Sequence, residues 1–253
     1  MHLTNALGNE KNAHMVRLQL AKADDVTRSA AAEQLKKVAL RLFAERGVDG
    51  VTVREIAAAA GQKNHGAVGY YFGSKEALVR AIVMDGAVAL DRERNAALDS
   101  LEREGGPRTI REVVDILVQP VLGLPDEHYV QFIVIFAMTH RDMMLDAIDP
   151  AWNIAYGRCL DHLRRLMPHL SPGLQNQRFV FMGAYISAVL SARQRALVDH
   201  SRAHPMWGSD SSLEHFMQSL VALLDAPADL PQEMLDGIGG GAGAIPEQPG
   251  PVG

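Results

Sequence analysis

Apolar residues recur every three or four positions along most of the chain, and no stretch alternates apolar and polar residues as a half-buried strand would. The clearest case is residues 29–46, where one face carries Leu35, Val38, Ala39, Leu42 and Phe43, and Gly47 follows as a natural helix end. The same spacing predicts helices over residues 75–104, 109–122, 127–146, 150–167, 173–199 and 211–225. The pattern therefore predicts an all-α protein.

Between the first two long helices, residues 52–78 predict two short helices in TVREIAAAAGQKNHGAVGYYFGSKEAL. Thr52 and Glu55 have the spacing of a capping box, and Gly61 should end the helix that they begin. Asn64 is positioned to cap the second helix, and Ser74 to cap the long helix that follows. Two short helices around a glycine-containing turn are typical of a helix-turn-helix, whose second helix enters the DNA major groove. With residues 29–46 they form a three-helix unit whose expected core is Leu35, Val38, Leu42, Phe43, Val51, Ile56, Val68 and Phe72.

The distribution of charge supports DNA binding although the net charge is −5. Residues 27–80 hold nine Lys/Arg and five Asp/Glu, a net +4, whereas residues 81–253 carry 13 basic and 22 acidic residues, a net −9. Phosphate contact depends on the local charge, so the basic segment is the relevant one. No run approaches the ~20 apolar residues of a membrane span, and Cys159 is the only cysteine. The N-terminus also lacks the pattern of a signal peptide, and we expect a cytoplasmic protein.

Residues 30–80 resemble the DNA-binding domain of the TetR family of bacterial transcriptional regulators. The resemblance rests on an ordered set of elements, RLFAERGVDGVTVREIAAAAG and then YYFGSKEAL. It implies a homodimer with an N-terminal helix-turn-helix domain and a C-terminal helical domain for ligand binding and dimerisation, and it favours a repressor. The expected divisions are an arm at 1–26, a DNA-binding domain at 27–74, a ligand-binding and dimerisation domain at 75–225 and a disordered tail at 226–253.

The turn departs from the family pattern in two ways. Both Gln62 and Lys63 precede Asn64, where the family usually has one residue, so the register of the recognition helix is open by one position. Gly69 stands where the family often has a side chain that contacts DNA. It either permits close approach of the backbone to a phosphate, or leaves the contact to Tyr70.

Candidate DNA contacts fall into two groups, for each of which the alternative is a solvated surface position. Side chains at the start and open face of the recognition helix can reach base edges: Asn64, His65, Gly66, Ala67, Gly69 and Tyr70. Phosphate contacts are expected from Thr52 and Arg54 at a helix N-terminus and from Lys63, Tyr71 and Lys75. The N-terminal arm, with Arg17, Lys22 and Arg28, either reaches the minor groove or is a disordered tail.

The C-terminal helices carry the candidates for ligand and dimer contacts. Flexible and aromatic residues suit an adaptable apolar cavity, and His140 could anchor a ligand. The candidate pocket residues are Phe136, Met138, His140, Trp152, Tyr156, Cys159, Phe181, Met182 and Tyr185, with ordinary core packing as the alternative. Residues 173–225 carry more apolar surface than outer helices of a monomer need, which the resemblance explains as an intermolecular four-helix bundle. The expected partners are thus double-stranded operator DNA, a second copy of the chain and a small apolar or amphipathic ligand.

Two other functional classes fit the sequence less well. His200, His204 and His215 could bind zinc in an enzyme, but no HExxH motif is present and these residues straddle a helix end. There is also no G-x-S-x-G elbow, and Cys159 has no local activating signature. An architectural or RNA-binding helical protein would not need a large acidic domain of cavity-like composition. We therefore expect neither catalysis, cofactor, metal nor membrane association.

Overall fold

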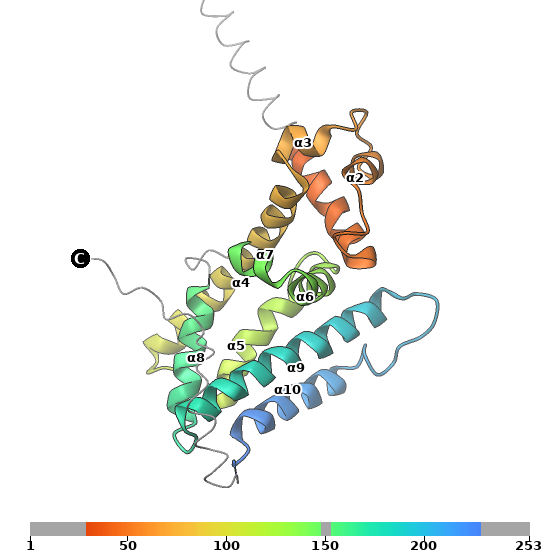
Figure 1. Ribbon diagram of the computed structural model, residues 1–253. Helices are drawn as coiled ribbons and strands as arrows, with labels where there is room; N and C mark the ends of the chain where they lie inside the picture. The colour runs from red at the N-terminus through yellow and green to blue at the C-terminus, as the bar shows by residue number, and fades with distance from the viewer. Residues whose placement is uncertain (1–28, 148–152, 229–253) are drawn as a thin grey trace, which may run out of the picture. The chain divides into compact units, whose positions relative to one another are not determined.

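The computed structural model describes residues 29–147 and 153–228, and within those ranges the secondary structure is helical, without strands (Figure 1). A first helix covers residues 29–46. It is followed by α2 (Val53–Ala59), α3 (Ala67–Phe72), α4 (Lys75–Arg103), α5 (Ile110–Leu122), α6 (Tyr129–Thr139), α7 (Arg141–Ala147), α8 (Ile154–Leu166), α9 (Pro172–Val198) and α10 (Asp210–Asp225). The all-α prediction is confirmed. The expected arm at 1–26 and the tail beyond 228 lie outside the described residues, as does Pro150, the expected start of the 150–167 helix.

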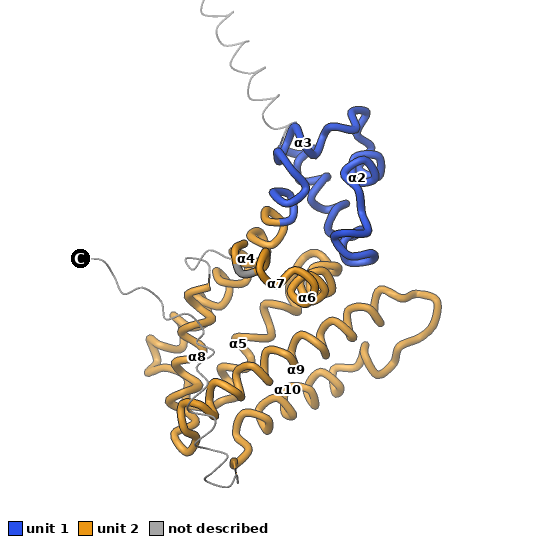
Figure 2. The backbone as a smooth tube through the Cα atoms, viewed as in Figure 1, with its two compact units in different colours: residues 1–79 blue, residues 80–253 orange. Residues whose placement is uncertain are grey.

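The chain divides into two compact units, residues 1–79 and 80–253 (Figure 2). The first unit thus extends to Val79, five residues beyond the expected domain boundary at 74. It includes the first turn of α4, because Leu78 and Val79 are fully buried.

The core of the first unit is formed by residues of the expected apolar stripe. Leu35, Phe43, Ile56 and Val68 are 0% exposed, so the helix over residues 29–46 and the two short helices α2 and α3 all contribute to the apolar core. Phe72 is a correction: it is only half-buried, since it is the last residue of α3 and Gly73 turns the chain away directly after it.

In the second unit, α5, α9 and α10 run alongside one another, and α6 and α8 pack against this group (Figure 2). α5 begins with a second capping box, in which Thr109 accepts from the Glu112 amide and the Glu112 carboxylate accepts from the Thr109 amide. The core includes Val113, Leu117, Cys159, Leu163, Met182, Met217, Leu220 and Leu224. No helix of the described residues is long and apolar enough to cross a membrane.

The helix expected over residues 127–146 is in fact two helices, α6 and α7, which meet at His140. The Thr139 hydroxyl donates to the Ile135 carbonyl at 2.8 Å and also contacts the His140 ring at 2.8 Å. Such bonds from a side chain to the preceding turn bend helices, and His140 leaves the helical region with φ −134° and ψ 52°. The apolar pattern continues through the break, which is why periodicity alone did not reveal it.

Candidate functional site

The connection between α2 and α3 is longer than the sequence suggested. Gly61 ends α2 with φ +68°, a conformation that favours glycine. Asn64 does not cap α3, which is a correction: its Oδ1 accepts from the Gly66 amide at 2.8 Å in a turn before the helix. Gly66 is the N-cap residue of α3, without a side-chain hydrogen bond, and the helix begins at Ala67. The local hydrogen bond of Asn64 therefore delays the helix by two residues, about half a turn, relative to the expectation.

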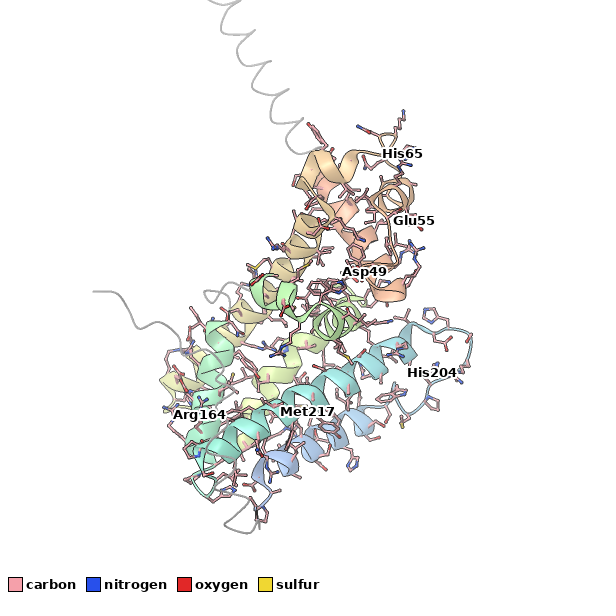
Figure 3. All side chains as sticks on the ribbon, viewed as in Figure 1. Asp49, Glu55, His65, Arg164, His204 and Met217 are labelled. Carbon is pink, nitrogen blue, oxygen red and sulfur yellow. The ribbon has the colours of Figure 1, made fainter. Side chains whose placement is uncertain are left out.

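This register decides which residues of the turn and α3 face outward. Asn64, His65, Gly66, Gly69 and Tyr70 are exposed, and His65 is labelled at the turn in Figure 3. Tyr70 is 62% exposed, and its ring meets the Tyr71 ring edge-on at 4.9 Å between centroids.

Ala67 is the exception among the expected outward positions. It is only 3% exposed and belongs to the core of the unit, beside the fully buried Val68. It was expected on the open face because α3 was expected to begin at Asn64; with the helix beginning at Ala67, that methyl group points inward.

Gly69 lies in the middle of α3 with open space beside it. A Cβ atom built on its backbone meets no heavy atom within 4 Å. Its φ is not positive either, so neither internal packing nor backbone conformation requires glycine here. Either a partner outside the unit requires glycine at position 69, or nothing requires it.

The N-terminus of α2 carries the expected capping box. The Thr52 hydroxyl accepts from the Glu55 amide at 3.3 Å and lies 2.7 Å from Glu55 Oε2, which also accepts from the Thr52 amide at 2.8 Å. Arg46 Nη1 lies 2.9 Å from the other Glu55 oxygen. Hydrogen bonds from Thr52, and then from Arg46, lower the pKa of Glu55 to about 2. The Thr52 hydroxyl is thus already engaged, whereas the amides of Val53 and Arg54 have no partner inside the helix.

Positive charge in the first unit is unevenly compensated. Glu33, Glu45 and Glu55 pair with Lys36, Arg41 and Arg46 at 2.7, 3.5 and 2.9 Å respectively. By contrast, Arg54, Lys63 and Lys75 form no salt bridge with any residue of the described ranges. Arg54 and Lys63 are exposed and Lys75 is half-exposed. Uncompensated cations at α2, at the turn and at the start of α4 suit contact with a phosphate backbone.

Residues 35–82 match the family model described as bacterial regulatory proteins, tetR family. The chain belongs to the TetR family. It is a DNA-binding transcriptional regulator with a helix-turn-helix in its first unit. This is a family of regulators rather than enzymes. No curated protein sequence matches the chain.

A comparison with solved structures finds a similar fold in one regulator that covers most of this chain, and weaker matches in two others. A tetR family transcription regulator from Shewanella sp. PV-4 is 16% identical and covers 77% of this chain and 96% of its own, with a TM-score of 0.52. A transcriptional regulator from a Rhodococcus species is 24% identical over 78% of this chain and 96% of its own, with a TM-score of 0.46. A TetR-family regulator from Mesorhizobium loti is 16% identical and covers 79% of this chain and 95% of its own, with a TM-score of 0.45.

The second unit of this TetR-family protein contains a cavity of about 330 Å³. That volume is within the ~300–1,000 Å³ range of small-molecule sites. Its walls come from α4 to α9 and include Leu90, Arg94, Leu117, Val121, Leu124, Tyr129, Val130, Ile133, Val134, Met144, Tyr156, Met182, Gly183, Ile186, Ser187 and Leu190.

The expected pocket residues are distributed unevenly around this cavity. Tyr156 and Met182 line it, whereas Phe136 and Cys159 are buried in the core. Burial raises the pKa of the Cys159 thiol to about 11, so the thiol is protonated at neutral pH.

Four other expected pocket residues lie elsewhere, and Trp152 is outside the described residues. Met138 and Phe181 are corrections: they are 81% and 53% exposed and line no enclosed space, because they lie on outer faces of α6 and α9. His140 ends α6 and stacks on Phe136 at 5.3 Å. Tyr185 lines a different pocket, between α9 and α10, and its hydroxyl lies 2.8 Å from Ser219 Oγ.

The zinc alternative finds no support in the geometry. His204 lies 3.2 Å from Asp199, and in residues 29–147 and 153–228 no three His, Cys, Asp or Glu side chains gather as a metal site would require.

Proposed function

We propose that this protein is a repressor that binds a near-palindromic operator as a homodimer and leaves it when a small molecule enters the second unit. The observation that carries the DNA part is the combination of an outward α3 face with uncompensated cations on both of its flanks.

Base edges are read from the turn and from α3. Asn64 and His65 offer hydrogen-bonding groups in the turn before α3, and Tyr70 presents its ring within the helix. Gly66 and Gly69 let the backbone come close to the DNA, since neither carries a side chain that would hold it away.

Phosphates are held at three places around that face. Arg54 and the first amides of α2 form one contact, with the Thr52 hydroxyl retained by Glu55. Lys63 in the turn forms the second, and Lys75 with Tyr71 forms the third. These contacts set the position of α3 in the groove without reading sequence.

The dimer forms through α9 and α10, about residues 173–225. Val180, Phe181 and Leu197 on α9 are 64%, 53% and 39% exposed, and Met206 just after α9 is 57% exposed. The adjacent Val180 and Phe181 are the most exposed of these, and large apolar groups exposed next to one another mark a candidate protein–protein contact. A two-fold dimer would place two α3 helices about 34 Å apart, one turn of DNA.

The DNA assignment is tested by fluorescence anisotropy with the DNA that flanks the protein's own gene. We expect a dimer to bind with an affinity that falls steeply with salt. Tyr70→Ala combined with Lys75→Ala should abolish the complex with the helical content unchanged. Arg92→Ala, an exposed cation on the same helix as Lys75, is the matched control and should retain it. Unchanged affinity in the double variant would refute the assignment of α3.

The dimer assignment is tested separately by sedimentation. Phe181→Asp should convert the dimer to a monomer, because a carboxylate cannot be buried unpaired at an apolar interface. Met138→Asp, at a residue of α6 that is still more exposed, is the control and should leave the dimer intact. A dimeric Phe181→Asp protein would place the interface elsewhere.

A further inference from the structure

Arg94 lies among the apolar walls of the 330 Å³ cavity, with most of its hydrogen-bonding groups unused. Its Nη2 donates to the Leu117 carbonyl at 3.0 Å. Its Nε is buried and has no hydrogen-bond partner among the described residues. A guanidinium has five N–H donors and stays charged in proteins, so this cavity contains a positive charge with unsatisfied donors.

No carboxylate of the described chain compensates that charge at close range. Asp91, one turn before Arg94, is itself buried, and both of its oxygens are engaged. Oδ1 accepts from the Ala155 amide and Oδ2 from Asn95 Nδ2, each at 2.8 Å. Asp91 contributes only at a distance, and burial lowers the pKa of Arg94. An unpaired buried charge is costly, and a charged partner with good geometry relieves that cost.

The rest of the cavity is apolar, with two hydroxyl groups on its wall. Tyr156 and Ser187 both line it, and neither side chain forms a hydrogen bond within the part of the chain that the structure describes. Most of the other lining residues are aliphatic, among them Val121, Ile133 and Ile186. The cavity thus combines one cation and two uncharged polar groups with a large apolar surface.

We propose that the cavity binds an amphipathic carboxylic acid, whose carboxylate pairs with Arg94 and whose apolar chain or ring packs against the aliphatic wall. A guanidinium matches a carboxylate in geometry and can bind it through two parallel hydrogen bonds. A single positive charge balances a monoanion, whereas a phosphate dianion would leave excess negative charge in an apolar space. A regulatory role for this ligand rests on the proposed function. Arg94 lies on α4, and the first turn of that helix belongs to the DNA-binding unit.

The test is calorimetric titration of the full-length protein, without DNA, with octanoate, decanoate and phenylacetate, and with 1-octanol and octylamine for comparison. At least one acid should bind, and at least about tenfold more tightly than 1-octanol, because a charge-assisted pair contributes that much. Octylamine should bind no better than 1-octanol. Equal binding of acid and alcohol, no binding of any acid, or tight binding only of inorganic phosphate would overturn the proposal.

Variants then locate the charge. Arg94→Met should remove the preference for the acid and leave 1-octanol binding within about threefold. Arg94→Lys should retain part of the preference for the acid. If Arg94→Met does not fold, Arg94→Lys provides the test instead. Arg92→Met, exposed on the same helix, should behave as wild type. Loss of the preference in Arg193→Met, which lines the pocket between α9 and α10, but not in Arg94→Met, would contradict the assignment. These titrations contain no DNA, so failure of the operator assay alone would leave them valid.

Discussion

Replacing Gly69 with alanine separates the two explanations for a glycine in the middle of α3. The structure offers no internal reason for it, since an added Cβ would meet no atom within 4 Å and φ is not positive. Alanine is about 0.8–1.0 kcal/mol better than glycine in a helix interior. If the glycine is neutral, the variant is more stable and binds DNA equally well; if it admits the DNA backbone, the variant gains stability and loses affinity.

We expect the second outcome, with a magnitude that follows from the site. The unfolding free energy of the first unit should rise by about 0.5–1 kcal/mol, or about 4–8 °C in Tm for each 1 kcal/mol in a domain of this size. At the interface, one methyl group in a closely packed space costs about 1–3 kcal/mol. Operator affinity should therefore fall by about 5- to 150-fold.

The assay pairs thermal melts followed by circular dichroism with anisotropy titrations on the same preparation. Gly183→Ala is the matched control, since its Cβ also meets nothing within 4 Å but it lies on α9 in the second unit. It should raise stability, which isolates the gain that alanine brings to an open helical position; since Gly183 lines the cavity of the second unit, it is a control for stability only. A Gly69→Ala protein with unchanged affinity would refute the close approach, and one that melts earlier would refute the open geometry around α3.

The remaining predictions concern packing and capping. In Gly86→Ala, the new Cβ would lie 2.0 Å from the Tyr129 ring, whose hydroxyl donates to the Val83 carbonyl, so we expect a loss of about 1–3 kcal/mol in thermal melts of the second unit; an unchanged melt would contradict this packing. Thr52→Ala removes one half of a capping box and should cost the first unit about 1 kcal/mol in urea unfolding, whereas no loss would mean that the box contributes little. Because the folded pKa of Glu55 is about 2, below its ordinary 4.5, its stabilisation is complete above pH 4.5 and is lost as the pH falls toward 2. Glu55→Gln, which still fits a capping box, should therefore show a weaker acid dependence of unfolding between those pH values than wild type, and an equal dependence would show that other groups cause it.

Much of the first unit could be predicted because its signals are local. The capping box of Thr52 and Glu55, the end of α2 at Gly61 and the cap at Ser74 each depend on residues within four positions of one another. The apolar stripe of residues 29–46 identified most of the core for the same reason. Local capping chemistry and helical spacing indicate the same helices here, and such agreement makes a fold predictable from its sequence.

The start of α3 was mispredicted because two local structures compete for one side chain. Asn64 favours both a helix N-cap and a turn in which it accepts from the amide two residues on. Glycine at position 66 makes the turn accessible, and the structure contains the turn. Since a helix turns through about 100° per residue, the delayed start moved Ala67 from the outer face to the core.

The cavity proposed to bind a ligand was the least predictable part, for a physical reason. Methionine and aromatic residues at helical spacing look alike whether they line a cavity, fill a core or lie exposed on the surface, and Met182, Phe136 and Phe181 illustrate the three cases. Arg94 gave no signal at all, because a charged residue within a long amphipathic helix normally faces solvent. Only the packing of α5, α6, α8 and α9 around α4 turns that cation inward. The sequence itself offers no contrast, because Arg94 directly follows Glu93 just as Arg92 and Arg103 lie beside acidic residues. Only the structure shows that Arg94 has no ion pair in the described ranges and that both Asp91 oxygens are engaged elsewhere. The residue that most restricts the ligand is thus recognised by the partners that it lacks within the described chain.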